Sequence, residues 1–259
     1  MTAAADSFDP RLTLARPDLA EQALEGLVRA DAYRAARPMR CTAPAADIHR
    51  DRGGAEPVDE LIFGEAFDVL EVHGDRVWGQ ARRDGVVGWV DRAALAEGAP
   101  LPGARVAAVN AALPLNALVA EPRGEDLEPI GTFEADPVAV AERLLGVPHR
   151  PGARSSRATD CAGLVQQALY ACGRPAPRYP DQQAELGEPV DRAAARRGDL
   201  VVWLHPGEAP WNGHSAFLMD GCQVLHATAW HGKVVVEPLS EAEARYAAEG
   251  FSAPLFRRL

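Results

Sequence analysis

The sequence predicts an α+β protein in which a small β-barrel domain precedes a domain of helices packed on an antiparallel sheet. Three observations support this fold class. Short β-rich runs separated by Gly and Asp fill residues 38–97, helical patterns follow residue 136, and further β-rich runs follow residue 199. Helices followed by sequential strands are typical of α+β folds rather than of alternating α/β folds.

The composition fits a globular protein and argues against several classes of function. The 259 residues are 47% hydrophobic and 25% charged, which disfavours disorder, a collagen-like repeat and a coiled coil. A formal net charge of -10 offers no basic field to nucleic acid or to an anionic membrane. No apolar run approaches the roughly 18 residues of a membrane span, and Asp6, Asp9 and Pro10 interrupt the first stretch where a signal peptide needs an apolar core. We therefore expect a cytoplasmic protein with neither a nucleic-acid nor a membrane partner.

Residues 1–37 are expected to form a helical segment. Asp18 occupies a typical N-cap position, and Glu21 follows three residues later. Apolar residues then recur at helical spacing: Leu19, Ala23, Leu24, Leu27 and Val28. This pattern predicts one short amphipathic helix.

Residues 38–97 are expected to form the β-barrel. Strands are predicted at residues 67–72, 77–81 and 86–90, with turns at Gly74-Asp75 and Asp84-Gly85. The next part, residues 98–136, is rich in Ala, Pro and Gly, and only residues 105–109 and 117–120 resemble strands. This part is either a linker or a shortened second barrel.

Residues 137–259 are expected to form the largest domain. A helix is predicted to follow Asp136-Pro137 and to break at Gly146, and a second helix covers residues 161–172. Asp199 is expected to cap the turn into the first strand of the sheet. The strands are predicted at residues 200–204, 215–219, 224–228 and 233–237.

Cys161 is the strongest candidate for a nucleophile. It opens a helix with an apolar stripe, and the unpaired N–H groups and positive dipole end of a helix N-terminus favour a thiolate. A small cysteine buried in a helix cap would give the same pattern, so its position alone leaves both interpretations open. The four cysteines lack the paired spacing of a disulfide framework or a zinc site: Cys41, Cys161, Cys172 and Cys222.

His214 and His226 are the best candidates for a base and for the residue that orients it. They lie on the two strands of a predicted hairpin at an even offset, so their side chains can share one face of the sheet. A single histidine in a strand is more often structural, and it is the pair that argues for catalysis. No carboxylate or second cysteine stands at ligand spacing, so we expect no metal. Three tryptophans are candidates for the cleft or the core: Trp203, Trp211 and Trp230.

Four segments in sequence order resemble the motifs of the NlpC family of papain-like cysteine peptidases. They are residues 159–166, 197–203, 213–216 and 224–227. The resemblance covers about residues 137–240 and implies that Cys161 is the nucleophile, His214 the base and His226 the orienting residue. Residues 39–95 resemble the bacterial Src-homology-3-like barrel that precedes the peptidase domain in cytoplasmic relatives.

This resemblance implies a cysteine endopeptidase that hydrolyses the γ-D-glutamyl-L-diamino-acid bond of murein-derived peptides during cell-wall peptide recycling, without a cofactor. Asp160 would hold the amino group of the peptide substrate, as an aspartate before the cysteine does in the family. Glu65 in the barrel is a second candidate for that task.

Three positions depart from the family pattern. His149–Ala153 replace a Tyr-x-Trp-Gly-Gly loop, Ala162 replaces a serine, and Val86 replaces a tyrosine of the pocket. His149 can still donate a hydrogen bond to an oxyanion, but the new loop supplies no aromatic wall. The retained triad favours an active enzyme of altered specificity. The alternatives are a degenerate peptidase that only binds peptides, which a cleft filled by Arg150 or Trp211 would favour, and an acyltransferase with the same triad.

Overall fold

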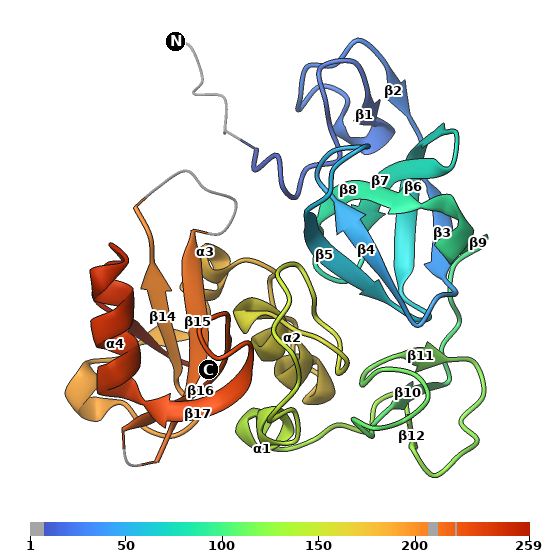
Figure 1. Ribbon diagram of the computed structural model, residues 1–259. Helices are drawn as coiled ribbons and strands as arrows, with labels where there is room; N and C mark the ends of the chain where they lie inside the picture. Colours follow the sequence, from blue (N-terminus) through green and yellow to red (C-terminus); the bar gives the residue numbers. More distant parts are fainter. Residues whose placement is uncertain (1–7, 207–211, 221) are drawn as a thin grey trace.

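The chain forms four sheets, described over residues 8–206, 212–220 and 222–259 in a computed structural model. The barrel sheet and the six-stranded sheet of the second half lie side by side, and a three-stranded sheet lies below the barrel (Figure 1). No helix in these described ranges is long and apolar enough to cross a bilayer.

The N-terminal segment does not form the predicted helix, so that prediction was wrong. Its described part consists of β1 (Ala20–Glu21), the 3-10 helix η1 (Gln22–Leu24) and β2 (Tyr33–Arg34). Gly26 adopts a φ of 82° just after η1, a left-handed conformation that stops helical propagation. Leu19 is buried with Trp78 and Trp89 of the barrel. Packing on the barrel therefore outweighs the local helical pattern.

Seven antiparallel strands form the barrel sheet in the order β5-β4-β8-β7-β6-β3-β9. They are β3 (Arg37–Cys41), β4 (Ala45–His49), β5 (Pro57–Ile62), β6 (Ala66–His73), β7 (Arg76–Ala81), β8 (Val87–Asp91) and β9 (Leu95–Glu97), with the 3-10 helix η2 (Arg92–Ala94) before β9. Inward residues such as Ile48, Phe67 and Val77 are buried in its core. β6, β7 and β8 correspond to the three strands that the sequence predicts.

Residues 98–136 contain a three-stranded sheet in which β10 pairs antiparallel with both neighbours. The strands are β10 (Ala104–Val106), β11 (Leu118–Val119) and β12 (Leu127–Pro129). Val106 and Ala117 pack with Ile62 of the barrel in a small core. The segment is thus folded against the barrel.

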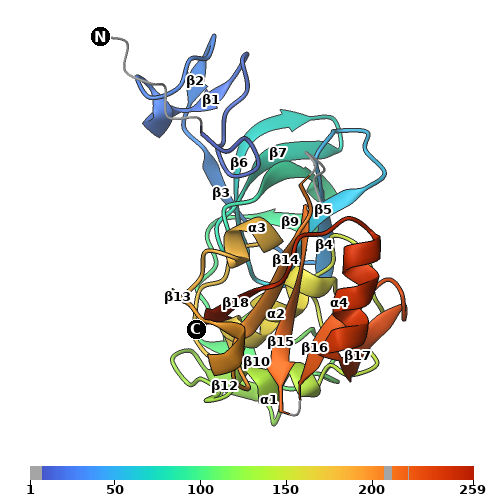
Figure 2. The ribbon, with the colours of Figure 1, turned by 90° about the vertical axis from the view of Figure 1, so that its left-hand side faces the viewer.

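The second half is a six-stranded sheet with helices on both faces. The strand order is β13-β18-β14-β15-β16-β17. Its strands are β13 (Glu188–Pro189), β14 (Leu200–Leu204), β15 (Gly213–Met219), β16 (Gln223–Thr228), β17 (Lys233–Pro238) and β18 (Leu255–Arg258), and its helices are α1 (Pro137–Glu142), α2 (Cys161–Ala171), α3 (Pro180–Gln183), η3 (Arg192–Ala194) and α4 (Leu239–Ala248). α2 packs on one face and α4 on the other (Figure 2).

A buried ionic network joins the barrel to the second half. Arg154 donates hydrogen bonds to Asp59 at 3.0 Å and to Glu65 at 3.1 Å. Arg178 contacts Asp59 at 2.9 Å and Asp160 at 3.0 Å. Both arginine side chains are 0% exposed, so the network excludes water. It fixes the loop before α2 and the cap of α2 against the barrel.

Candidate active site

Cys161 is the first residue of α2, as the sequence predicts. Asp160 is the N-cap, and its side chain accepts the N–H of Gly163 at 2.9 Å. A Cβ on Gly163 would lie 2.4 Å from the carbonyl oxygen of Ala153, so the missing side chain lets the preceding loop lie tightly on the helix. The thiol therefore stands where this loop meets the helix N-terminus.

His214 and His226 share one face of the sheet, which confirms the expectation from their even spacing. Nε2 of His214 lies 2.8 Å from Nδ1 of His226. The His214 ring packs on Tyr246, with a centroid distance of 4.5 Å, and on Trp203. Both histidines are buried, so these contacts hold the two rings in fixed orientations.

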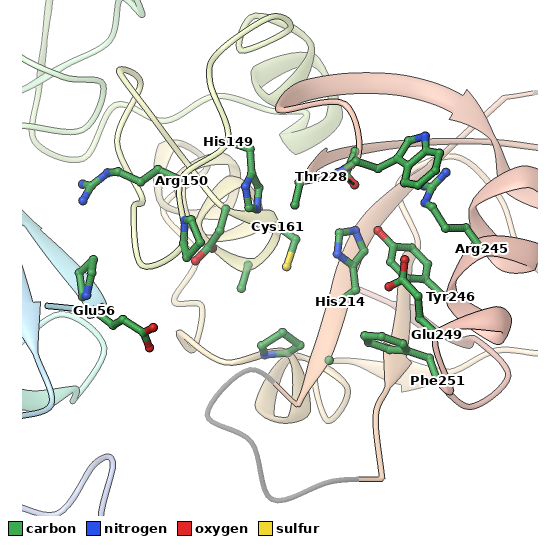
Figure 3. A pocket seen from close by; sticks show the side chains of 18 of the residues that line it. Glu56, His149, Arg150, Cys161, His214, Thr228, Arg245, Tyr246, Glu249 and Phe251 are labelled. Carbon is green, nitrogen blue, oxygen red and sulfur yellow. Dashed lines mark hydrogen bonds between the residues drawn. The ribbon is translucent and has the colours of Figure 1, made fainter.

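Cys161 and His214 line one open cleft of about 970 Å³ (Figure 3). The Arg150 side chain is turned toward the barrel, where it pairs with Asp47 at 2.8 Å and Glu60 at 2.6 Å. Arg150 therefore does not fill the cleft, and a cleft filled by this side chain would have favoured the binding-module alternative.

The three candidate tryptophans fall in different places. Trp230 lines the cleft and is 72% exposed, whereas Trp203 is buried behind His214. Trp211 lies outside the described residues. Of the two tryptophans that the structure describes, Trp230 is placed to contact a substrate.

The surroundings of Cys161 favour the neutral thiol. Burial and the nearby Asp160 raise the pKa of Cys161 to about 12, against the opposing effect of the Ser215 and Ala162 N–H groups. Burial and the neighbouring His226 lower the pKa of His214 well below its ordinary value. Burial thus opposes the thiolate stabilisation that is expected from the helix N-terminus.

The carboxylate of Asp160 is already paired. Its two oxygens accept the N–H groups of Gly163 and Gly152, each at 2.9 Å, and both are bonded by the Arg178 guanidinium. Its charge is compensated and no strong acceptor position is left for a substrate ammonium. Asp160 lines the cleft, and its role toward the amino group of the substrate stays a prediction.

The expectation for Glu65 is corrected. Its side chain is 1% exposed, is bonded to Arg154, and lies outside the cleft. Val86 is likewise buried, in the barrel core, and does not line the cleft.

His149 lines the cleft near Cys161, on the loop that replaces the aromatic motif (Figure 3). Burial lowers the pKa of its imidazole, which favours a neutral ring that still carries one N–H donor. Asp199 has the structural role that the sequence predicts, since it accepts the N–H of Arg196 at 2.9 Å and pairs with Arg258.

The sequence analysis missed three carboxylates at the site. Glu237 on β17 accepts a hydrogen bond from His226, with a distance of 2.7 Å to Nε2. The pairing of Val235 with His226 places Glu237 two residues further along, on the same face, so strand register is the signal that could have found it. Glu56 of the barrel and Glu249 after α4 also line the cleft. No cluster of three potential metal ligands occurs within the described ranges.

Comparisons with known proteins agree with this architecture. Residues 146–250 match the NlpC/P60 family, and residues 49–95 match the bacterial dipeptidyl-peptidase Sh3 domain. A solved NlpC/P60 family protein from Bacillus cereus superposes with a TM-score of 0.69 at 16% identity, covering 85% of this chain and 99% of that one. This likeness shows the fold.

Two curated relatives match part of this chain at higher identity. The peptidoglycan endopeptidase RipB of Mycobacterium tuberculosis is 36% identical over 84 residues, which is 32% of this chain and 33% of the relative. A murein DD-endopeptidase and LD-carboxypeptidase, MepS of Escherichia coli, is 32% identical over 97 residues, or 37% of this chain and 50% of the relative. The chain thus spans a third to a half of their length.

The chain thus resembles the NlpC/P60 family over residues 146–250 and a bacterial Sh3 domain over residues 49–95, and the two curated relatives are named as peptidoglycan and murein endopeptidases.

Proposed function

We propose that this chain hydrolyses the γ-D-glutamyl-L-diamino-acid bond of murein-derived peptides in cell-wall peptide recycling. Cys161 is the nucleophile, His214 the base and His226 the residue that orients the base. The observation that carries the proposal is the contact of 2.8 Å between the two histidines at the cleft that Cys161 lines. Cys161 and His214 both line this cleft, and covalent catalysis uses a nucleophile, a base and a group that orients the base.

The reaction follows from this geometry. His214 takes the thiol proton, and the sulfur attacks the carbonyl carbon of the γ-glutamyl amide. The backbone N–H of Cys161, which has no partner within α2, and the imidazole N–H of His149 stabilise the oxyanion. His214 then protonates the leaving amine, and water, deprotonated by His214, hydrolyses the thioester.

The charges of the cleft complement a peptide with two ammonium groups. Arg150 and Arg245, the two arginines of the lining, are engaged by Asp47 and Glu237. Glu56 and Glu249 are exposed, and neither is paired with an arginine or lysine in the described part of the chain. They lie on opposite sides of Cys161 (Figure 3). We assign one to the amino terminus of the peptide and the other to the side-chain ammonium of the diamino acid.

The direct test is incubation with L-Ala-γ-D-Glu-meso-diaminopimelate, followed by mass spectrometry of the released diamino acid. Wild-type protein is expected to release it, and Cys161→Ala is not. Absence of release with rapid alkylation of Cys161 would indicate another substrate. Absence of release with an unreactive thiol would favour the peptide-binding module.

The assignment of the two carboxylates has its own test. Glu56→Gln and Glu249→Gln are each expected to raise KM about 5- to 10-fold with little change in kcat, since each removes one charge-assisted contact. Glu125→Gln, an exposed carboxylate away from the cleft, is the matched control. An unchanged KM in both cleft variants would refute the assignment.

A further inference from the structure

The chain of contacts behind His214 continues beyond His226. Oε1 of Glu237 lies 2.7 Å from Nε2 of His226, and the glutamate side chain is only 7% exposed. Arg245 of α4 donates to both oxygens of Glu237, at 3.1 Å to Oε2. The exposed side of the carboxylate meets His231, whose Nε2 lies 3.3 Å from Oε2. Groups from β16, α4 and the β16–β17 turn thus converge on one carboxylate.

These contacts determine where the protons lie on the two catalytic histidines. Arg245 and the neighbouring histidines lower the pKa of Glu237 despite its burial, so the carboxylate is ionised and can only accept hydrogen bonds. Nε2 of His226 must therefore carry the hydrogen of that contact. When His226 is neutral, its Nδ1 carries no hydrogen and can only accept a hydrogen bond. The donor in the contact between the two rings is therefore the Nε2–H group of His214. Nδ1 of His214 is left as the basic nitrogen.

We propose that Glu237, held by Arg245, is a positioning residue of the peptidase reaction: it sets the direction of the hydrogen bonds through His226, so that Nδ1 of His214 receives the proton of Cys161. The proposal rests on the proposed function. When the proton moves from sulfur to Nδ1, the Nε2–H of His214 stays donated to His226. The resulting imidazolium is then compensated by an anion two contacts away.

The local sequence explains why this carboxylate is available. His226 pairs with Val235, so residue 237 projects from the same face of the sheet as the histidine. Pro238 follows at once and α4 begins at Leu239, which brings Arg245 back over the end of β17. Glu237 and Arg245 therefore come from β17 and α4, the strand and the helix that complete and follow the sheet region of the two histidines.

A merely structural ion pair between α4 and β17 would show the same contacts, so the test must read the histidines themselves. We would compare wild type with Glu237→Gln, which keeps the size of the side chain but removes the charge and offers a donor as well as an acceptor. Glu243→Gln is the matched control, because Glu243 lies on α4 and binds Arg192 at 2.7 and 2.9 Å, away from the cleft.

The first readout is ¹⁵N NMR of histidine-labelled protein, which needs no substrate. In wild type, His214 and His226 are both expected to carry hydrogen on Nε2 and to have a bare Nδ1. Glu237→Gln is expected to give mixed tautomers, while Glu243→Gln leaves the wild-type pattern. A wild-type His226 with its hydrogen on Nδ1, or an unchanged pattern in Glu237→Gln, would overturn the proposal even if the peptide substrate is wrongly chosen.

The second readout is kinetic. Glu237→Gln is expected to lower kcat about 10- to 100-fold at nearly constant KM, and to move the acid limb of the rate profile to lower pH, because the imidazolium loses an anion that stabilises it. Glu237→Asp, which restores the charge, should recover part of the rate. The proposal fails if a folded Glu237→Gln protein retains both the kcat and the pH profile of kcat that Glu243→Gln shows.

Discussion

Replacing Arg154 with methionine is expected to destabilise the protein by about 3–5 kcal/mol at pH 7, the usual cost of removing one partner from a buried ion pair. The guanidinium is 0% exposed and donates to Asp59 at 3.0 Å and to both oxygens of Glu65 at 3.1 and 2.5 Å. Methionine keeps most of the apolar stem but none of these bonds. Glu65 would retain only the Ile62 N–H at 2.9 Å and Arg83 at 3.5 Å.

The assay is urea denaturation followed by tryptophan fluorescence, with Arg82→Met as the control. Arg82 binds Asp68 with a similar two-pronged geometry, at 3.0 and 2.5 Å, but its side chain is 51% exposed. Its loss should cost no more than about 1 kcal/mol. Equal destabilisation by the two substitutions would refute the reasoning.

The pH dependence of the stability of the Arg154→Met variant tests the direction of the pKa shift of Glu65. Burial raises the pKa of Glu65, but Arg154 and Arg83 outweigh burial and hold it below its ordinary value. In wild type this stabilisation is therefore present above the unfolded pKa and is lost only as the pH falls through the folded pKa. Without Arg154, burial dominates and Glu65 takes up a proton at higher pH. The difference in stability between variant and wild type should shrink from pH 7 to pH 5, and a difference that widens would contradict the argument.

Three further predictions concern the cleft. Gly163→Ala should cost about 1–3 kcal/mol in thermal denaturation, because its Cβ would meet a carbonyl oxygen at 2.4 Å, whereas Gly53→Ala, with open space around it, should change stability by less than about 0.5 kcal/mol. Because burial raises the pKa of Cys161 to about 12, its alkylation rate in the substrate-free protein should rise about tenfold per pH unit from pH 7 to pH 9; a plateau near pH 7, with the exposed Cys222 as internal reference, would contradict this. His149→Ala should lower kcat about 10²- to 10³-fold with little effect on KM, and His149→Gln, which keeps a donor, should recover part of that loss.

Local pattern was sufficient to locate β6 to β8, β14 to β17 and the helix that begins at Cys161. β14 to β17 combine β-branched runs with short turns, and α2 has an N-cap, an apolar stripe and a glycine after its end. The even spacing of His214 and His226 was enough to place both on one face, because no bulge interrupts their hairpin. These features depend on residues that are close in sequence.

The features that the sequence did not predict depend on contacts between residues that are distant in sequence. Arg178 is 18 residues from Asp160, and Arg154 is 89 residues from Glu65, so the neutralisation of Glu65 depends on how the barrel docks and that of Asp160 on how the loop after α2 folds back. Glu237 could be found only from the register of two strands together with the position of α4. The helix predicted around Leu19 does not form for a related reason. Leu19 packs against the barrel, a distant contact that the local helical pattern does not include.

The ionic network between the two halves also bears on the order in which the active site forms. The barrel is synthesised first, so Asp59, Glu60 and Glu65 are in place before Arg154 and Arg178 leave the ribosome. Glu60 accepts the backbone N–H of Arg154 at 3.1 Å, so the barrel holds both the side chain and the backbone of the loop that packs against α2. A fragment made of the second half alone would lack the barrel carboxylates that bind this loop. The barrel is thus the surface against which the surroundings of Cys161 fold.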